Sequence, residues 1–381
     1  MNEQKKVAFV TNMCTHYVVK LFELLSKEYK VDFYFTGGDE DYWDKRNNLW
    51  TGNFNGQYLR GFRIFKKFKI TPQLLELWYK DYDFFIKTIE NRFALPFVFL
   101  TAKIKKRPFI LWTQLWMHPR TFFHRFFYGF MKFIYRHCDA IIVYGPHVKN
   151  YLMDLKIPEH KIFIAPQSMD NEQFNRPVGD EEKQRLLQEL NLSGKKIVLY
   201  VGRLEECKGL IYLMEAISWL EDLNVSLLLI GTGTQKSFLE KKSKELSVRT
   251  LFLGHISNEE LYRYYALTDV FVLPSITTAN FKEPWGIVVN EAMNQGCPVV
   301  ATDAVGAAVG GLVIQGKNGF VVPERNSFAL KEALEKILKD DVLKSQMAAE
   351  SKKNIEDWTP RQTLKGFIKA IEFACGATQK S

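Results

Sequence analysis

The sequence predicts an α/β protein made of two doubly wound, parallel-sheet domains, and three observations support this. Short apolar runs alternate with amphipathic segments along the chain, the pattern of repeated strand–helix–strand units. The length of 381 residues exceeds what one ordinary core accommodates. A polar segment with Pro177 and Gly179 separates two complete series of units. We therefore expect two Rossmann-like domains that face each other across a central cleft.

The first domain is expected over residues 1–170 and the second over 195–358, with a linker at 171–194. The segment 359–381 holds a last amphipathic helix, which the sequence assigns to neither domain. Predicted strands of the first half are KKVAFVT, KVDFYF, DFFIKT, RPFILWT and AIIVYG. Predicted strands of the second half are KKIVLYVG, VSLLLIGTG, TLFLGHI, DVFVLPS and PVVAT. The segments between these strands have helical periodicity.

The positive charge is concentrated in the first half of the chain. The net charge is +9, and residues 51–150 hold 17 Lys and Arg against 5 Asp and Glu. This asymmetry favours an anionic partner, either a membrane surface, nucleic acid or an acidic substrate. We expect no nucleic acid, because no recognition-helix or RNA-binding sheet motif is present.

Cysteine usage and hydropathy predict a cytoplasmic protein. The five cysteines are scattered without C-x-x-C spacing, which is typical of a reducing compartment and not of a disulfide framework or zinc site. The N-terminal apolar run is too short for a signal peptide, and no stretch of 18 uninterrupted apolar residues occurs. Peripheral contact with the inner face of the cell membrane stays open.

The segment 202–209, GRLEECKG, follows the strand IVLYV and opens a helix. A turn at the carboxyl end of a parallel strand is a common anion site in α/β domains. Arg203 and Lys208 are spaced to reach one diphosphate, Arg203 as a planar fork and Lys208 as a point charge. The alternative is an ordinary glycine turn with solvated charges.

The segment 283–291, EPWGIVVNE, places two glutamates on either side of a Pro-Trp-Gly corner. Glu283 precedes a predicted helix, where the helix dipole favours a negative charge. Glu291 lies inside that helix among apolar residues. It therefore either occupies a wet edge of the helix or holds a polar ligand.

Two other motifs are interpreted as structural. The GTG at 231–233 lacks the third glycine and the acid of a dinucleotide fingerprint, so a tight turn explains it. Asp81 and Asp83 could hold a divalent metal. However, an acid commonly caps a strand start, and no second carboxylate cluster accompanies them. We expect no metal site.

The segment 120–138, RTFFHRFFYGFMKFIYRHC, mixes aromatic and basic residues. One helical stripe is predicted to lie in the core, and it comprises Phe122, Phe126, Phe130 and Phe133. The aromatics beside basic residues suit the headgroup zone of a bilayer, as do the neighbouring basic runs KIKKRP and FRIFKKFK. A plain basic surface is an equally good explanation.

The second half of the chain resembles the retaining glycosyltransferases of family 4, which have the GT-B fold. The motifs that carry the resemblance are the glutamate pair, the Arg203–Lys208 turn, DVFVLPS before the pair and NGFVVP after it. It covers essentially all of 195–340 and is looser over the N-terminal half. It points to a bacterial enzyme of the cell-surface or capsular polysaccharide type.

The resemblance implies catalytic and donor-binding roles. Arg203 and Lys208 would neutralise the departing diphosphate in place of a divalent cation. Glu283 would face the donor sugar, and Glu291 would accept hydrogen bonds from the ribose hydroxyls. The remaining donor-binding residues would be Gly286 and Ile287, whose amides cradle the distal phosphate, and Ile256, in the loop that contacts the base mainly through its main chain.

Two departures from the family pattern concern the N-terminal half. TNMCTHYVV stands where many members carry a glycine-rich loop, which gives His16 or Asn12 a potential part. Gln114 stands near the position of a common family histidine, and His118 follows four residues later. We include His118 as the fourth catalytic candidate.

The predicted function is retaining, metal-independent transfer of a hexose from a nucleoside-diphosphate sugar to a hydroxyl acceptor. The basic, aromatic N-terminal half favours a saccharide or lipid-linked acceptor at a membrane. No cofactor is expected, since the nucleotide sugar is a substrate. Two alternatives are a sugar-nucleotide epimerase with the same fold, and an inactive partner subunit that binds nucleotide sugar without turning it over.

Overall fold

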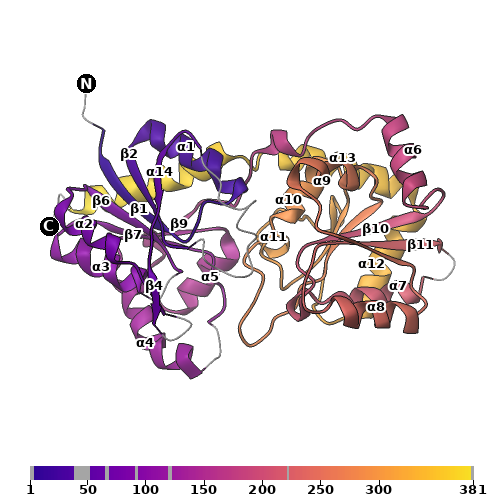
Figure 1. Cartoon of the computed structure of the whole chain (residues 1–381), viewed down its shortest axis with the longest axis horizontal. Helices are drawn as coiled ribbons and strands as arrows, with labels where there is room; N and C mark the ends of the chain where they lie inside the picture. The colour runs from indigo at the N-terminus through magenta and orange to yellow at the C-terminus, as the bar shows by residue number, and fades with distance from the viewer. Residues whose placement is uncertain are drawn as a thin grey trace. The chain divides into compact units, whose positions relative to one another are not determined.

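The structure of the chain is a computed structural model that describes residues 4–37, 52–64, 68–90, 93–118, 122–220 and 223–378. It divides into two compact units (Figure 1). The first unit consists of Met1–His118, Phe122–Met169 and Trp358–Ser381, and the second is built mainly from Asp170–Asp357.

The first unit is organised around a parallel sheet with the strand order β3-β2-β1-β6-β7-β8-β9 in the described residues. Its strands are β1 (Lys6–Thr11), β2 (Lys30–Phe35), β3 (Asn55–Tyr58), β6 (Phe84–Thr88), β7 (Phe109–Thr113), β8 (Ala140–Val143) and β9 (Ile162–Ile164). A separate hairpin pairs β4 (Phe62–Ile64) with β5 (Phe68–Ile70). The α-helices are α1 (Val19–Glu28), α2 (Glu76–Tyr79), α3 (Ala94–Ile104), α4 (Phe122–His137), α5 (Pro146–Asp154) and α14 (Pro360–Thr378).

The second unit has a parallel sheet with the order β12-β11-β10-β13-β14-β15. Its strands are β10 (Lys196–Val201), β11 (Val225–Ile230), β12 (Thr250–Gly254), β13 (Val270–Leu273), β14 (Val299–Thr302) and β15 (Gly319–Val322). Its α-helices are α6 (Asp180–Glu189), α7 (Leu210–Ser218), α8 (Lys236–Glu245), α9 (Asn258–Ala266), α10 (Val288–Asn294), α11 (Gly306–Val309), α12 (Ser327–Lys339) and α13 (Asp341–Ile355). This is the Rossmann order, so the prediction of two doubly wound α/β domains is confirmed.

Both sheets are buried as the apolar runs predict. Every residue of β7 and β8 is buried, as expected for parallel strands covered on both faces. In each unit the winding direction reverses between two central strands, β1 and β6 in the first and β10 and β13 in the second. Ligands of open α/β sheets bind beyond the carboxyl ends of strands at such reversal points.

The last helix, which the sequence left unassigned, belongs to the first unit. In α14, Phe367 is fully buried and lies 5.1 Å from Trp112, ring centre to ring centre. Gly366 allows the helix to approach β9 closely, since an added Cβ would lie 2.4 Å from the Ile164 carbonyl oxygen. The chain therefore returns to its first sheet after completing the second.

Two expectations need correction. The segment 171–194 is part of the second compact unit and carries α6, so it is not a separate linker. Its last part is polar because α6 lies at the surface with no buried residue.

Phe130 and Phe133, predicted as core, are 40% and 47% exposed because they lie on the solvent side of α4. The side chains of Phe122 and Phe126 lie outside the described residues.

Among the described residues, no helix is both long enough and apolar enough to cross a lipid bilayer.

Candidate active site

The turn after β10 is shaped by a buried tyrosine and a glycine. Tyr200 is fully buried and donates its hydroxyl hydrogen to the carbonyl oxygen of Arg203 over 2.7 Å. Gly202 has a φ of 148°, and an added Cβ would lie 2.7 Å from the Tyr200 hydroxyl. The Arg203 side chain is exposed. The turn therefore fixes the Arg203 backbone and leaves the guanidinium accessible to an anion.

Lys208 ends a single 3₁₀ turn, Glu206–Lys208, just before α7. Gly209 follows in the left-handed region with a φ of 63°, and an added Cβ would lie 2.1 Å from the Pro274 carbonyl oxygen. The glycine thus lets the loop after β10 contact the loop after β13. Because these strands are neighbours, the two loops meet at the reversal point of the sheet.

Lys208 forms a nearly buried ion pair with Glu283; the two residues are 9% and 7% exposed. The ammonium donates to Glu283 Oε2, and the Ser275 hydroxyl donates to the same oxygen over 2.9 Å. The Phe281 ring lies 5.1 Å from the Lys208 Nζ. Desolvating two charges costs several kcal/mol per ion, and an apolar replacement is often as stable. The stability of the fold alone therefore does not require this pair.

The corner between the two glutamates positions the start of α10. The Trp285 indole is buried and donates to Asn290 Oδ1 over 2.8 Å. Gly286 has a φ of 93°, and an added Cβ would lie 2.5 Å from Leu273 Cδ2. Gly286 and Ile287 directly precede α10, where backbone amides lack intrahelical acceptors. Their position allows the predicted contact with a phosphate.

Glu291 does not lie at a wet edge of the helix, because it is only 2% exposed. Its Oε2 accepts a hydrogen bond from the Tyr265 hydroxyl over 2.7 Å. Burial, together with the Glu291 carboxylate, raises the pKa of Tyr265 well above its ordinary value, so the hydroxyl is a donor. The wet-edge alternative for Glu291 is therefore wrong, and a polar partner that the structure shows is the Tyr265 hydroxyl. Binding of a ligand by Glu291 stays a prediction.

Two candidate residues remain, Ile256 in the second unit and His118 in the first. Ile256 is half-buried in the loop after β12, at the same edge of the second sheet. His118 belongs to the first unit, is half-buried, and has its ring 4.3 Å from that of Tyr128. Its catalytic role stays a prediction.

The two motifs interpreted as structural have structural contacts. An added Cβ on Gly231 would lie 1.9 Å from the Gly202 carbonyl oxygen, and on Gly233 2.2 Å from that of Leu204, so these glycines pack two loops together. Asp83 Oδ2 accepts from the Lys6 amide over 2.7 Å, at the start of β1. In the described part of the chain, no three metal-ligating side chains gather. Metal independence stays a prediction.

Sequence reasoning missed three contributors to the site: Ser275, Phe281 and Tyr265. Ser275 ends the quoted DVFVLPS run and Phe281 lies two residues before Glu283, so their positions gave a weak signal. Tyr265 lies 26 residues before Glu291, and only the fold brings them together.

Comparison with known proteins relates the second half of the chain to a family. Residues 182–355 match the family model described as "Glycosyl transferases group 1". An uncharacterized glycosyltransferase of Methanocaldococcus jannaschii is 30% identical over 228 residues, which are 58% of this chain and 56% of that protein. The chain thus spans just over half the length of that relative. The capsular polysaccharide biosynthesis glycosyltransferase CapM of Staphylococcus aureus is 25% identical over 308 residues, 78% of each chain.

A solved structure shares the fold over nearly the whole chain. Anabaena HepE in complex with UDP has a TM-score of 0.75 at 16% identity, covering 96% of this chain and 99% of that one. Residues 182–355 are therefore similar to group 1 glycosyltransferases, and the chain has the GT-B fold.

Proposed function

We propose that this protein is a retaining, metal-independent glycosyltransferase of family 4, which moves a sugar from a nucleoside-diphosphate sugar to a hydroxyl acceptor. One observation carries the proposal: the nearly buried Lys208–Glu283 pair at the reversal point of the second sheet. A cation and a carboxylate there match the two charges that the reaction generates. Negative charge builds on the diphosphate, and positive charge builds on the sugar ring.

The cations would act on the diphosphate. Lys208 already donates to Glu283, and rotation of its ammonium would let it share a second oxygen acceptor. Arg203, exposed on the same turn, would supply a bidentate contact. Positioned donors of this kind typically change turnover 100- to 1,000-fold. The amides of Gly286 and Ile287 would add neutral donors to the distal phosphate.

The carboxylates would act on the two sugars of the donor. Glu283 would face the transferred sugar, with Ser275 fixing its carboxylate. Glu291, oriented by Tyr265, would accept from ribose hydroxyls. Ile256 would lie along the base, and His118 would approach the reacting sugar from the first unit.

The proposed acceptor is a saccharide, either free or lipid-linked, in cytoplasmic assembly of cell-surface polysaccharide. The likeness to CapM supports this process. An exposed apolar face on the first unit supports a membrane-held acceptor. We define this face by Leu75, Trp78, Tyr79, Leu100, Ile104, Phe130 and Phe133, which are 40–86% exposed.

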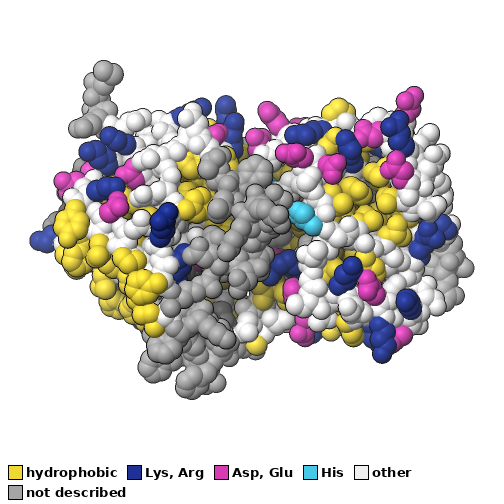
Figure 2. Space-filling model, viewed as in Figure 1, with side chains coloured by type: hydrophobic (Ala, Val, Ile, Leu, Met, Phe, Trp, Pro, Cys, Tyr) yellow, Lys and Arg dark blue, Asp and Glu magenta, His cyan; other side chains and the backbone are white. Residues whose placement is uncertain are grey.

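In the space-filling view, exposed apolar side chains gather on the first unit over α2 and α3 (Figure 2). Trp78 of α2 stacks 6.1 Å from Phe97 of α3, and Phe99 of α3 lies 6.1 Å from Phe133 of α4. Basic residues lie close to these apolar residues in the sequence: Lys80, Lys103, Lys105, Lys106 and Arg107. Aromatic and aliphatic groups flanked by lysines suit the interface of an anionic bilayer.

The transfer reaction is tested with purified protein, a panel of nucleoside-diphosphate sugars and lipid-linked saccharide acceptors. We expect acceptor-dependent release of nucleoside diphosphate that persists in excess EDTA, with product whose anomeric configuration by NMR matches the donor. Isomerised nucleotide sugar would instead indicate an epimerase. Donor binding without turnover on any acceptor would indicate a partner subunit.

The membrane contact is tested by sedimentation with vesicles of anionic or neutral lipid. We expect binding to anionic vesicles that weakens as salt rises, because screening shortens below about 8 Å above physiological ionic strength. Tyr79→Ser with Ile104→Ser should reduce binding, and charge reversal at Lys105 and Lys106 should do the same. Trp219→Ser is the matched control, since Trp219 is 53% exposed on the other unit. Equal binding to both lipids would contradict the contact.

A further inference from the structure

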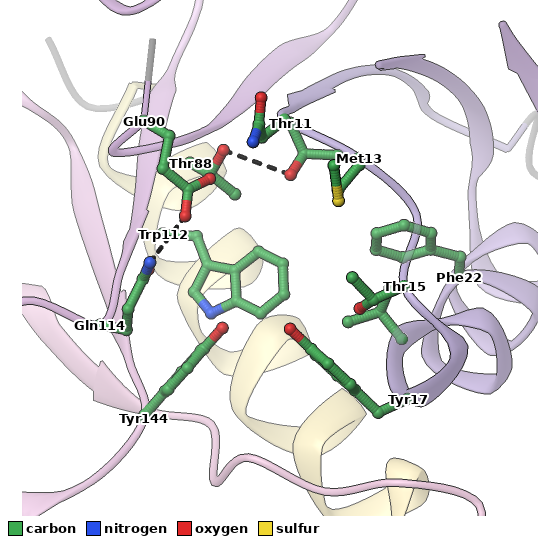
Figure 3. Close-up of a pocket in the computed structure, with 12 residues that line it drawn as sticks. Thr11, Met13, Thr15, Tyr17, Phe22, Thr88, Glu90, Trp112, Gln114 and Tyr144 are labelled. Carbon is green, nitrogen blue, oxygen red and sulfur yellow. Dashed lines mark hydrogen bonds between the residues drawn. The ribbon is translucent and has the colours of Figure 1, made fainter. Parts of the chain in front are cut away.

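The first unit contains a pocket at the reversal point of its own sheet, beyond the carboxyl ends of β1, β6 and β7 (Figure 3). Its volume is about 190 Å³. At about 30 Å³ per liquid water, this is room for about six water molecules. The pocket is therefore large enough for one small ring. Polar side chains from separate strands line it, among them Thr11, Thr88, Glu90 and Gln114.

One carboxylate in the pocket has a fixed orientation. Glu90 Oε1 accepts a hydrogen bond from Gln114 Nε2 over 2.7 Å. Lys87, a fully buried residue of β6, stabilises the turn that carries Glu90. The Lys87 ammonium donates to the carbonyl oxygens of Thr88 and Glu90, each over 2.8 Å. Lys87 is thus a positioning residue for Glu90.

A buried donor faces the same pocket without a partner. Trp112 is only 3% exposed. Its indole Nε1 is buried and has no hydrogen-bond acceptor among the described residues. Figure 3 shows the side chains of Trp112, Tyr17 and Tyr144 directed toward one another across the pocket. Burial raises the pKa of both tyrosines, so their hydroxyls are protonated donors. An unpaired buried N–H is unfavourable, and a hydrogen bond to an oxygen of a ligand would relieve this.

These groups select a ligand by chemistry. A fixed carboxylate accepts from hydroxyl groups, the indole and phenol groups donate to them, and aromatic rings pack against apolar C–H faces. An anionic ligand is disfavoured, because Glu90 would repel it at short range. We propose that this pocket binds one uncharged polyhydroxylated ring, a sugar or a cyclic polyol, with Glu90 and Trp112 as its main hydrogen-bonding partners.

The proposed ligand of this pocket is neutral. The proposed ligand of the second unit is anionic, because Arg203 and Lys208 suit a diphosphate. The identification of the ring with the acceptor's sugar rests on the proposed function, whereas binding of the ring does not. A neutral acceptor ring excludes sugar phosphates as preferred acceptors, and this sharpens the substrate class.

The test uses the full chain and direct binding by saturation-transfer NMR and calorimetry. The probes are neutral hexoses and inositol, with glucose 6-phosphate as the charged comparison. We expect saturable binding of at least one neutral ring and at least tenfold weaker binding of the phosphate. Glu90→Gln keeps the shape and should weaken ring binding about tenfold or more. Trp112→Phe removes the indole donor and should also weaken it. Glu76→Gln, a surface change on α2, is the matched control and should have no effect.

UDP binding and melting temperature, measured on the same variants, separate the possible failures. Unchanged ring affinity in Glu90→Gln with normal UDP binding would overturn the pocket and leave the transferase proposal standing. Preferred binding of glucose 6-phosphate would also overturn it. Ring binding that depends on Glu90, together with no transfer to any hydroxyl acceptor, would support the pocket and contradict the proposed function. If Trp112→Phe fails to fold, Thr88→Val replaces it. This change removes one pocket hydroxyl and should also weaken ring binding.

Discussion

Two lysines are buried in the described part of the chain, one in each unit, and their surroundings differ. Lys87 is fully buried on β6 and donates to two backbone carbonyls. Lys208 is 9% exposed beyond β10 and donates to the carboxylate of Glu283. Both lie near the reversal point of their sheet. One ammonium is therefore held by neutral dipoles and the other by an opposite charge.

The difference shows how position and partner set the use of a buried cation. Burial lowers the pKa of Lys87 to about 7, and the Glu90 carboxylate only partly offsets this. Lys87 therefore suits a structural role, in which its hydrogen bonds stabilise the turn that carries Glu90. The charge of Lys208 is balanced by Glu283 and lies at the loop edge, where a ligand's oxygens can approach. The second arrangement suits catalysis and the first suits support.

The largest effect is expected when the balanced pair is broken. Glu283→Gln leaves the Lys208 ammonium nearly buried without its counter-charge, and breaking a buried pair costs roughly 3–5 kcal/mol of unfolding free energy. Turnover should also fall by roughly 100-fold or more, because a charge at the reacting centre is lost. Urea unfolding and steady-state kinetics measure both effects.

The double variant Lys208→Met with Glu283→Gln separates the two contributions. It removes the stranded charge, so stability should largely return while turnover stays low. A Glu283→Gln protein with normal stability and turnover would show that the pair is neither buried in solution nor catalytic.

The next effect is a pH dependence of the unfolding free energy that arises from Lys87. The pKa of Lys87 is about 7 in the folded chain against an ordinary value of 10.5. Between these values the unfolded chain binds more protons, so unfolding free energy rises with pH, by up to about 1.4 kcal/mol per unit. Below pH 7 both states are protonated, and the unfavourable contribution is constant.

Replacing Lys87 by Met should remove this rise. Urea unfolding is measured at pH 6, 7, 8 and 9. The unfolding free energy of wild type relative to the variant should increase with pH only above pH 7. Lys106→Met is the surface control and should keep the wild-type slope, since Lys106 is exposed. Equal slopes in wild type and Lys87→Met would contradict the account of Lys87.

The smallest effect concerns the hydroxyl that supports the ion pair. Ser275→Ala removes the 2.9 Å hydrogen bond to Glu283 Oε2, and hydrogen bonds to charged groups contribute about 1.5–3 kcal/mol. We expect lower stability and a smaller loss of kcat than in Glu283→Gln. Ser226→Ala is a matched control, because the Ser226 hydroxyl is fully buried with no partner among the described residues. Comparable losses in both serine variants would argue against a specific role for Ser275.

The fold was predictable because its signal is local. Parallel strands such as β7 and β8 are apolar throughout, and glycines at 202 and 209 mark turns with positive φ. The C-terminal helix could not be assigned, because any apolar face such as that around Phe367 fits either sheet. The exposure of Phe133 was missed for a related reason: periodicity shows that a stripe exists but not what covers it.

The candidate site was predictable only in part. The segments that carry Arg203, Lys208 and the two glutamates show their chemistry in the sequence. The Lys208–Glu283 contact joins positions 75 residues apart, and only the tertiary fold creates it. Lys87 was overlooked because a lysine within DFFIKT is expected to face solvent. In the structure, β6 is a central strand that is buried on both faces.

The most direct test of the central claim is the affinity for nucleoside diphosphates, measured by calorimetry for wild type, Lys208→Met and Lys87→Met at pH 7. The account predicts that wild type binds at least one of UDP, GDP and ADP. Lys208→Met should bind about tenfold more weakly or worse, since a hydrogen bond from a charged group is lost. Lys87→Met should keep the wild-type affinity. Wild-type affinity in Lys208→Met, or a loss confined to Lys87→Met, would contradict the assignment of the donor site to the second unit.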